Sequence, residues 1–252
     1  MISVIQKVVA KIILGFFDFL VGKFTANKPI LSVDDIPFYN LLISNRNVFL
    51  ENYLKISKDK QLNDIKNFYK IERDINEDDK WKAEPIMLFS YLFKENAAKC
   101  QETYSIIKQI PGCSAAMFSV LESGKYIPPH NGIYKGIYRC LFTLQLEANA
   151  DCWIRVNDVK TYFKEGELIM FDETAEHEVM NASSTERIAL YLDIYRQLPF
   201  PLNLYNKLIY FIIRKSPFVQ NILVEYKKLE NITIESINFL KPVLKAISDT
   251  VT

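Results

Sequence analysis

The chain has 252 residues, of which 49% are hydrophobic and 13% are aromatic, so it can bury a large core and is not disordered by composition. Its formal net charge is +1, which argues against the basic surface that general nucleic-acid binding requires. The four cysteines, Cys100, Cys113, Cys140 and Cys152, form no C-x-x-C pair, which argues against a structural zinc site and indicates reduced thiols in a cytoplasmic protein.

Residues 1–30 are apolar but interrupted by Lys7, Lys11 and Asp18. The longest apolar run, residues 12–17, falls short of the roughly 20 residues that a spanning helix needs. The segment also lacks the small-residue cleavage site of a signal peptide. We expect an amphipathic helix. It either lies at a membrane interface with its lysines toward the headgroups, or packs as a core helix at the edge of the domain.

Residues 31–200 are expected to form one domain that begins with helices. Apolar spacing predicts helices at 38–56 and 100–110, and mixed charge predicts a solvated surface segment at 58–82. After Gly112 the pattern changes to short runs rich in aromatic and branched residues, at 115–121, 137–146, 152–158, 167–172 and 187–194. Consecutive strands without long helices between them favour a β-sandwich or barrel with helices packed outside.

Residues 201–252 are expected to form a C-terminal helical extension. The apolar run 208–213 is followed at once by Arg214 and Lys215, with aromatic residues alongside. This pattern again indicates either an interfacial helix or a helix that packs onto the protein's own surface.

The chain has only two histidines, and both lie at predicted strand ends. His130 follows a Pro-Pro corner, and His177 follows the strand at 167–172 across a short loop. The mouth of a barrel would bring them together. Arg187 opens the next strand, ten residues after His177. A single histidine is more often a structural residue, but this layout is typical of iron oxygenases that use 2-oxoglutarate. Neutral imidazoles suit Fe(II), and an arginine fork can bind the cosubstrate's far carboxylate.

Three stretches carry a resemblance to a known family: AAMFSVLESGKYIPPHNGIYKGIYRCLFTL, WIRVNDVKTYFKEGELIMFDETAEHEVMNAS and ERIALYLDIYRQLPFP. They closely resemble the aspartyl/asparaginyl β-hydroxylase family, and best its bacterial branch, which includes lipid A acyl-chain and ornithine-lipid hydroxylases. The resemblance covers about residues 85 to 220. It implies a double-stranded β-helix core of the jelly-roll or cupin-like kind, mainly β with flanking helices, together with Fe(II), 2-oxoglutarate and O₂.

The resemblance also implies roles for single residues. His130 and His177 match the family's two iron ligands. Arg187 matches the arginine that binds the C5 carboxylate of 2-oxoglutarate, and Ser119 matches its serine helper. Arg139 matches an arginine of the same pocket, which serves either the cosubstrate or the substrate.

Many related oxygenases have a third, carboxylate ligand two residues after the first histidine. Here that position is Gly132, as is common in the family, so water is expected in its place. The nearby carboxylates Asp172, Glu173 and Glu176 are expected to support the ligands or shape the turn rather than to bind the metal.

One position departs from the family pattern. The relatives have LR-x-HL where this chain has YRCLF, so Leu141 stands in place of a histidine. Residues i and i+2 of a strand share a face, so Arg139 and Leu141 are expected to face the same pocket. The loss of a charge-assisted hydrogen bond, worth about 1.5–3 kcal/mol, would weaken cosubstrate binding or change the substrate's orientation.

The sequence therefore predicts a 2-oxoglutarate-dependent hydroxylase that acts on an unactivated C–H bond. The apolar ends of the chain favour an acyl chain or headgroup of a membrane lipid as substrate, with peripheral contact to the cytoplasmic membrane face. One alternative is a peptide Asp or Asn side chain, or a small amino-acid-derived substrate. Another is a jelly roll that only binds a ligand, which Leu141 alone supports. No nucleic-acid partner is expected, and the oligomeric state stays open.

Overall fold

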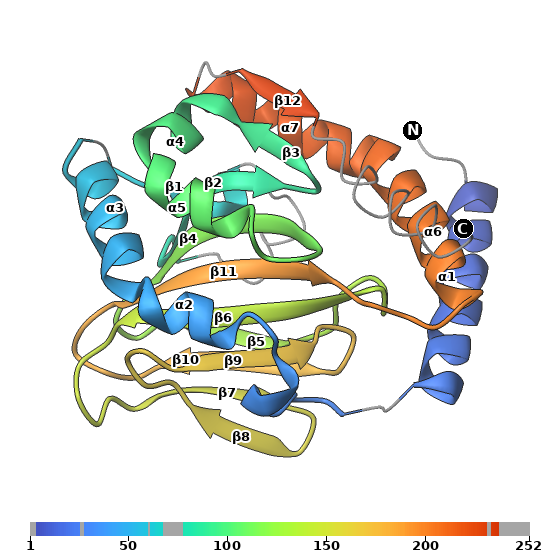
Figure 1. The fold of residues 1–252 in the computed structure, drawn as a ribbon, viewed down its shortest axis with the longest axis horizontal. Helices are drawn as coiled ribbons and strands as arrows, with labels where there is room; N and C mark the ends of the chain where they lie inside the picture. The colour runs from blue at the N-terminus through green and yellow to red at the C-terminus, as the bar shows by residue number, and fades with distance from the viewer. Residues whose placement is uncertain (1–3, 26–27, 60, 68–77, 231–232, 237–252) are drawn as a thin grey trace, which may run out of the picture.

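A computed structural model describes residues 4–25, 28–59, 61–67, 78–230 and 233–236 of the chain. Eight antiparallel strands build its centre (Figure 1). They are β4 (Cys113–Leu121), β5 (Tyr126–His130), β6 (Ile137–Gln145), β7 (Cys152–Val156), β8 (Val159–Tyr162), β9 (Leu168–Asp172), β10 (His177–Asn181) and β11 (Arg187–Tyr195).

Successive strands switch between two sheets, except that the hairpin of β7 and β8 stays in one sheet. The first sheet contains β4, β11, β6 and β9 as neighbours, and the second has the order β5-β10-β7-β8. This alternation is that of a double-stranded β-helix, so the expected jelly roll is present and the chain is mainly β. The first sheet is extended at the β4 edge by β1 (Asn63–Asp64), β2 (Trp81–Leu88), β3 (Tyr91–Phe93) and β12 (Ile234–Ser236).

Helices cover the outer face of the larger sheet and one end of the barrel (Figure 1). The helices are α1 (Val4–Phe24), α2 (Tyr39–Ser44), α3 (Arg46–Asp59), α4 (Lys94–Lys99), α5 (Gln101–Ile107), α6 (Leu202–Lys215) and α7 (Pro217–Glu230), with 3-10 turns η1 (Val33–Asp35) and η2 (Ile65–Asn67).

Strand alternation decides which residues reach the barrel interior. On β4 and β6, Phe118 and Phe142 point outward and pack edge-on against Tyr53 and Phe49 of α3. The residues between them point inward, toward the second sheet. Ser119 of β4 therefore points into the barrel interior, as do the inward side chains of the neighbouring strands. The site described below is built from these side chains.

Two elements differ from the sequence expectation. The helix expected at 38–56 is two helices, α2 and α3. They are separated at Asn45, whose side chain donates to the carbonyl of Leu41 over 2.8 Å. The segment 58–82, expected to be solvated, contains β1 and η2 and ends in the first residues of β2. Its Trp81 is 7% exposed, because β2 pairs with β4 in the larger sheet. Residues 60 and 68–77 of this segment lie outside the described residues.

The C-terminal region contains more than helices. After α6 and α7 the chain adds β12, which pairs antiparallel with β3. Among the described residues, no helix combines the length and hydropathy needed to cross a membrane.

Candidate active site

The two histidines lie opposite each other at the mouth of the barrel. His130 is the last residue of β5, His177 is the first residue of β10, and the two strands pair with these residues in register. The centroids of their rings are 4.1 Å apart. The sequence expectation that both stand at strand ends is confirmed, although the Pro-Pro pair lies inside β5 rather than at a corner before His130.

Backbone carbonyls fix the orientation of both rings. Nδ1 of His130 is 2.8 Å from the carbonyl oxygen of Pro128, and Nδ1 of His177 is 2.9 Å from that of Ala175. A carbonyl only accepts hydrogen bonds, so each Nδ1 carries the proton and donates. The lone pair is then on Nε2 of each neutral ring.

Both rings are in the protonation state that a metal ligand requires. Burial lowers the pKa of His130, and burial together with the neighbouring His130 ring lowers the pKa of His177 to about 3. Both imidazoles are therefore neutral at pH 7 and can bind a divalent cation without first losing a proton. Within the part of the chain that the structure describes, no third His, Cys, Asp or Glu completes a cluster with them.

Glu173 fills the space where a side chain at position 132 would begin. A Cβ on Gly132 would lie 2.5 Å from Cδ of Glu173 and 2.6 Å from its Cγ. The backbone N–H of Gly132 also donates to the carbonyl oxygen of Glu173 over 2.7 Å. The Glu173 carboxylate is buried and pairs with Arg139, Nη2 to Oε2, at 2.5 Å. A side chain at position 132 would therefore have to displace the Glu173 side chain, whose carboxylate is already bound to Arg139.

On one side of the histidines is a small cavity of about 30 Å³, lined by Ser119, Leu141, Arg187 and both histidines among others. Arg187 is 3% exposed, and its Nε and Nη1 are buried without a hydrogen-bond partner among the described residues. Its guanidinium lies 4.7 Å from the centre of the Phe163 ring. Burial lowers the pKa of this guanidinium, which stays charged at pH 7 because the pKa of a free arginine is so high. A buried cation with unused donors is suited to an anionic ligand.

Ser119 is prepared to donate into the same cavity. Nε1 of Trp81 donates to Oγ of Ser119 over 3.1 Å. Because the indole is only a donor, the serine accepts this bond, and its own proton stays available for a carboxylate beside Arg187. Sequence reasoning missed Trp81, because it follows the charged run NEDDK and was included in a surface segment.

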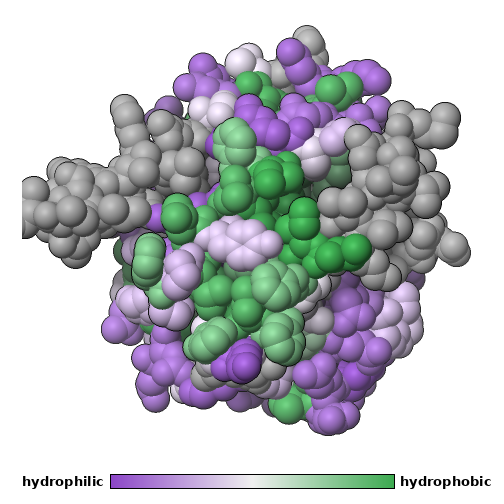
Figure 2. Space-filling view, turned by 90° about the vertical axis from the view of Figure 1, so that its right-hand side faces the viewer, coloured by the Kyte–Doolittle hydropathy of each residue, from purple (hydrophilic) through white to green (hydrophobic). Residues whose placement is uncertain are grey.

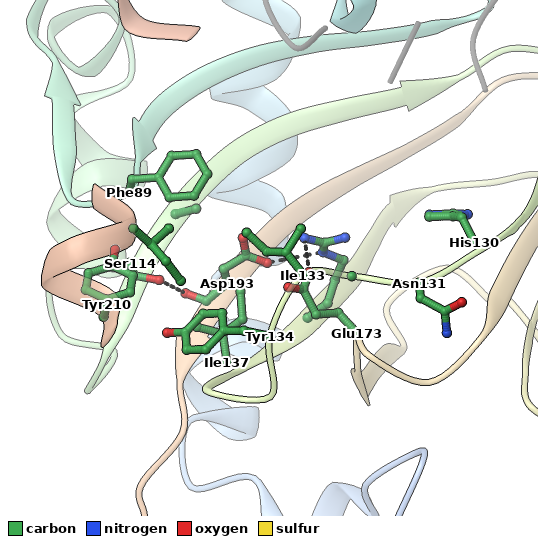
Figure 3. Close-up of a pocket in the computed structure, with 14 residues that line it drawn as sticks. Phe89, Ser114, His130, Asn131, Ile133, Tyr134, Ile137, Glu173, Asp193 and Tyr210 are labelled. Carbon is green, nitrogen blue, oxygen red and sulfur yellow. Dashed lines mark hydrogen bonds and ion pairs between the residues drawn. The ribbon is translucent and has the colours of Figure 1, made fainter. Parts of the chain in front are cut away.

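On the other side is a larger cavity of about 110 Å³, shown in Figure 3. His130 lies at one end of it, and Phe89, Ser114 and Tyr210 lie at the other. Its volume is below the roughly 300–1,000 Å³ of sites that enclose a whole drug-sized ligand.

Arg139 lines both cavities and forms part of the wall between them. Its Nε is 3.2 Å from Oδ1 of Asp193, its Nη2 binds Glu173, and its guanidinium lies 4.7 Å from the centre of the Tyr191 ring. Both carboxylates line the larger cavity only. The charge of Arg139 is therefore already paired by Glu173 and Asp193. Asp193 and Tyr191 were not predicted, although they share the inward face of β11 with Arg187 by simple alternation.

The fold and the site together define a class. The protein is a double-stranded β-helix with two neutral histidines at the barrel mouth and, in a small cavity beside them, a buried arginine without a hydrogen-bond partner at Nε and Nη1. The sequence model of the aspartyl/asparaginyl β-hydroxylases matches residues 44–197, and the chain belongs to this family.

Two curated proteins show where the similarity lies. An ornithine lipid ester-linked acyl 2-hydroxylase from Rhizobium tropici is 31% identical over 159 residues, which cover 63% of this chain and 57% of that protein. The human aspartyl/asparaginyl β-hydroxylase is 30% identical over 108 residues, which cover 40% of this chain and 14% of that protein. The chain thus spans little more than half of the first relative and a small part of the second.

Among solved structures, the cupin domain of an XRE-family transcriptional regulator from Enterobacter cloacae covers 47% of this chain and 99% of its own, with a TM-score of 0.33 and 11% identity. The cupin domain of Schizosaccharomyces pombe Cnp3 gives a TM-score of 0.32 and 13% identity, over 46% of this chain and 66% of its own. The assignment of the fold rests on the strand order rather than on these overlaps.

Proposed function

We propose that this protein is an Fe(II)- and 2-oxoglutarate-dependent hydroxylase whose substrate is the acyl chain of a membrane lipid. One observation carries the proposal: the adjacent neutral rings of His130 and His177 line the same cavity as Arg187, whose Nε and Nη1 have no hydrogen-bond partner. The first feature suits a divalent cation, and the second suits a carboxylate anion.

The residues present fit the implied metal and cosubstrate. His130 and His177 would hold Fe(II) through Nε2, and the carbonyls of Pro128 and Ala175 keep both rings in the required tautomer. Arg187 and Ser119 would hold the far carboxylate of 2-oxoglutarate. Once bound, this pair supplies the oxidation: one atom of O₂ enters a C–H bond as hydroxyl, and the other enters the carboxylate of succinate as CO₂ leaves.

The protein's own contribution is positioning and exclusion of water. Arg139 is fixed by Glu173 and Asp193, and it keeps the cosubstrate side and the substrate side apart. Phe171 packs edge-on against His177, with 4.9 Å between ring centroids, and covers one side of this ring. The larger cavity then presents one segment of a substrate to the side of His130.

The lipid substrate is supported by the relative and by the cavity. The Rhizobium protein is named for hydroxylation of an ester-linked acyl chain. A cavity of about 110 Å³ suits part of a chain, with the rest of the molecule outside. A panel of ornithine lipid, a phospholipid with the same acyl chain, and an Asp- or Asn-containing peptide tests this. We expect succinate formation and a hydroxylated product with a lipid. A product from the peptide alone would contradict the lipid assignment.

Arg187→Leu tests the cosubstrate site itself. The Michaelis constant for 2-oxoglutarate should rise by roughly two orders of magnitude, because a charged bidentate pair is lost. Without 2-oxoglutarate, the free energy of unfolding of the variant should equal that of wild type or exceed it by about 1 kcal/mol. The reason is that the substitution removes a buried cation without hydrogen-bond partners at Nε and Nη1. Steady-state succinate formation at varied 2-oxoglutarate concentration measures the first effect, and thermal unfolding without 2-oxoglutarate measures the second.

The matched control is Arg155→Leu. Arg155 lies on β7 and pairs with Glu176 and Glu178 near the surface. This variant should keep the 2-oxoglutarate affinity of wild type. If Arg187→Leu binds the cosubstrate normally, another residue holds the carboxylate and the assignment of Arg187 is wrong.

A further inference from the structure

Helices α1 and α6 present a continuous apolar surface to solvent. Phe16, Phe19, Leu204, Leu208, Phe211 and Ile212 are each between 48% and 61% exposed. We call these six residues the apolar face. Figure 2 looks at this side of the molecule and shows hydrophobic residues gathered in its centre, with hydrophilic residues above and below them.

The two helices form one surface because they pack on each other. Phe17 of α1 meets Tyr205 of α6 edge-on, with ring centroids 5.4 Å apart. Their inner sides are apolar too: Phe17, Val21 and Ile209 are buried in a shared cluster. Helices that are apolar on both sides are normally covered on both sides. A contiguous exposed apolar patch therefore indicates a docking surface.

The charges on these helices indicate what the docking partner is. α1 and α6 contain six lysines or arginines, Lys7, Lys11, Lys23, Lys207, Arg214 and Lys215, and a single acid. The acid is Asp18, whose carboxylate accepts a hydrogen bond from the backbone N–H of Lys135 over 2.8 Å, so it is tied to the barrel. The whole chain has a net charge of only +1. Among the described side chains of these two helices, Lys207 and Arg214 are buried, whereas Lys23 and Lys215 are exposed. The exposed charge that the helices present beside the apolar face is therefore positive.

We propose that the apolar face docks onto an anionic lipid bilayer, with its aromatic and aliphatic side chains in the headgroup layer and the lysines beside the phosphates. Self-association is disfavoured for the same reason. In a twofold dimer this surface would meet its own copy, so cations would oppose cations.

The position of α6 also links the docking surface to the substrate cavity. This link rests on the proposed function. While Leu208 and Phe211 point outward, Tyr210 and Ile213 of the same helix line the larger cavity beside His130. α6 is thus a wall shared by the bilayer and the substrate cavity. An acyl chain leaving the bilayer along this wall would reach the histidines without crossing open water.

Sedimentation of the full-length protein with vesicles tests the docking. Vesicles of phosphatidylcholine alone are compared with vesicles that also contain phosphatidylglycerol. The test variant is Leu204→Glu with Leu208→Glu on the apolar face. The control is Leu54→Glu with Leu229→Glu, two leucines 39% and 47% exposed on α3 and α7, which carries the same change of charge.

We expect wild type and the control to sediment with the anionic vesicles, and the test variant to bind at least tenfold less. The proposal is overturned by any of three results: wild type binds neither vesicle, both double variants lose binding equally, or neutral vesicles bind as well as anionic ones. A wild-type dimer that only the test variant dissociates would also overturn it, because the face would then bind a second copy.

Two further measurements distinguish a failure of docking from a failure of catalysis. 2-Oxoglutarate should raise the melting temperature of the test variant as much as that of wild type, because the small cavity lies between the two sheets and neither Leu204 nor Leu208 lines it. If no lipid is hydroxylated by any form of the protein, vesicle binding by wild type still supports the docking surface, and only the proposed reaction fails.

Discussion

Gly132 shows how one residue can decide the ligand set of the site. Its missing side chain leaves the space that Glu173 occupies, and Glu173 in turn holds Arg139. We expect Gly132→Ala to lower the free energy of unfolding by about 1–3 kcal/mol, the usual cost of overpacking a buried site. Chemical denaturation measures it. Gly15→Ala is the control, because a Cβ there meets nothing within 4 Å and should stabilise α1 by roughly 0.5–1 kcal/mol.

A double-mutant cycle with Glu173→Ala identifies the cause. Removing the Glu173 side chain opens the space, so Gly132→Ala should cost little in that background. If the two effects simply add, the packing of Glu173 against Gly132 is not what requires the glycine.

Only part of this arrangement of site residues could be predicted from the sequence. His130, His177 and Arg187 stand out by their order and spacing, and Ser119 by the resemblance to the family; all four line one cavity. The contact between Glu173 and Gly132 is not, because it joins two loops that only the folded barrel brings together. Trp81 stayed hidden for a similar reason: its donation to Ser119 depends on the pairing of β2 with β4.

At the scale of elements, the sequence pattern predicted those strands whose buried side chains are apolar. The five strands expected from the sequence agree closely with β4, β6, β7, β9 and β11. Two strands that carry the histidines were not expected. β5 contains two prolines and can hold them because it lies at the edge of its sheet. β10 buries His177, Val179 and Asn181, so two of its three buried residues are polar and the usual pattern is absent.

The register of β6 makes Leu141 a test of the cosubstrate cavity. Arg139 and Leu141 line it together, as alternation predicts, and Leu141 pairs across strands with Tyr191 and Ile169. Leu141→His should lower the unfolding free energy of the ligand-free protein by about 1–3 kcal/mol, because it buries a polar ring without a partner. 2-Oxoglutarate should offer that ring an acceptor, so its thermal shift should exceed that of wild type.

Leu144→His is the matched control for β6. Leu144 belongs to the outer cluster under the helices and is fully buried, so the variant should be destabilised without any recovery on adding 2-oxoglutarate. Equal behaviour of the two variants would show that Leu141 does not contact the cosubstrate.

At the scale of the whole molecule, packed apolar clusters hold the site in place. One apolar cluster lies between the larger sheet and helices α2, α3 and α5, and a second fills the barrel. Leu141, Phe171 and Tyr191 of the second cluster also line the small cavity beside the histidines. A third joins α1 and α6 to the barrel end. The fold should therefore persist without metal, while metal adds stability only through the two histidines.

Metal loading tests this expectation. Fe(II) added under nitrogen to chelator-treated wild type should stabilise it by about 2.7 kcal/mol at a concentration 100 times the dissociation constant. For a chain of this size that corresponds to a rise of roughly 5–10 °C in melting temperature. His177→Ala should fold, because its ring donates one hydrogen bond, to the Ala175 carbonyl, but should show no such rise. The control is Glu176→Ala, which changes an exposed neighbour paired with Arg155 and should keep the full shift. A His177→Ala protein that still gains the full shift would place the metal elsewhere.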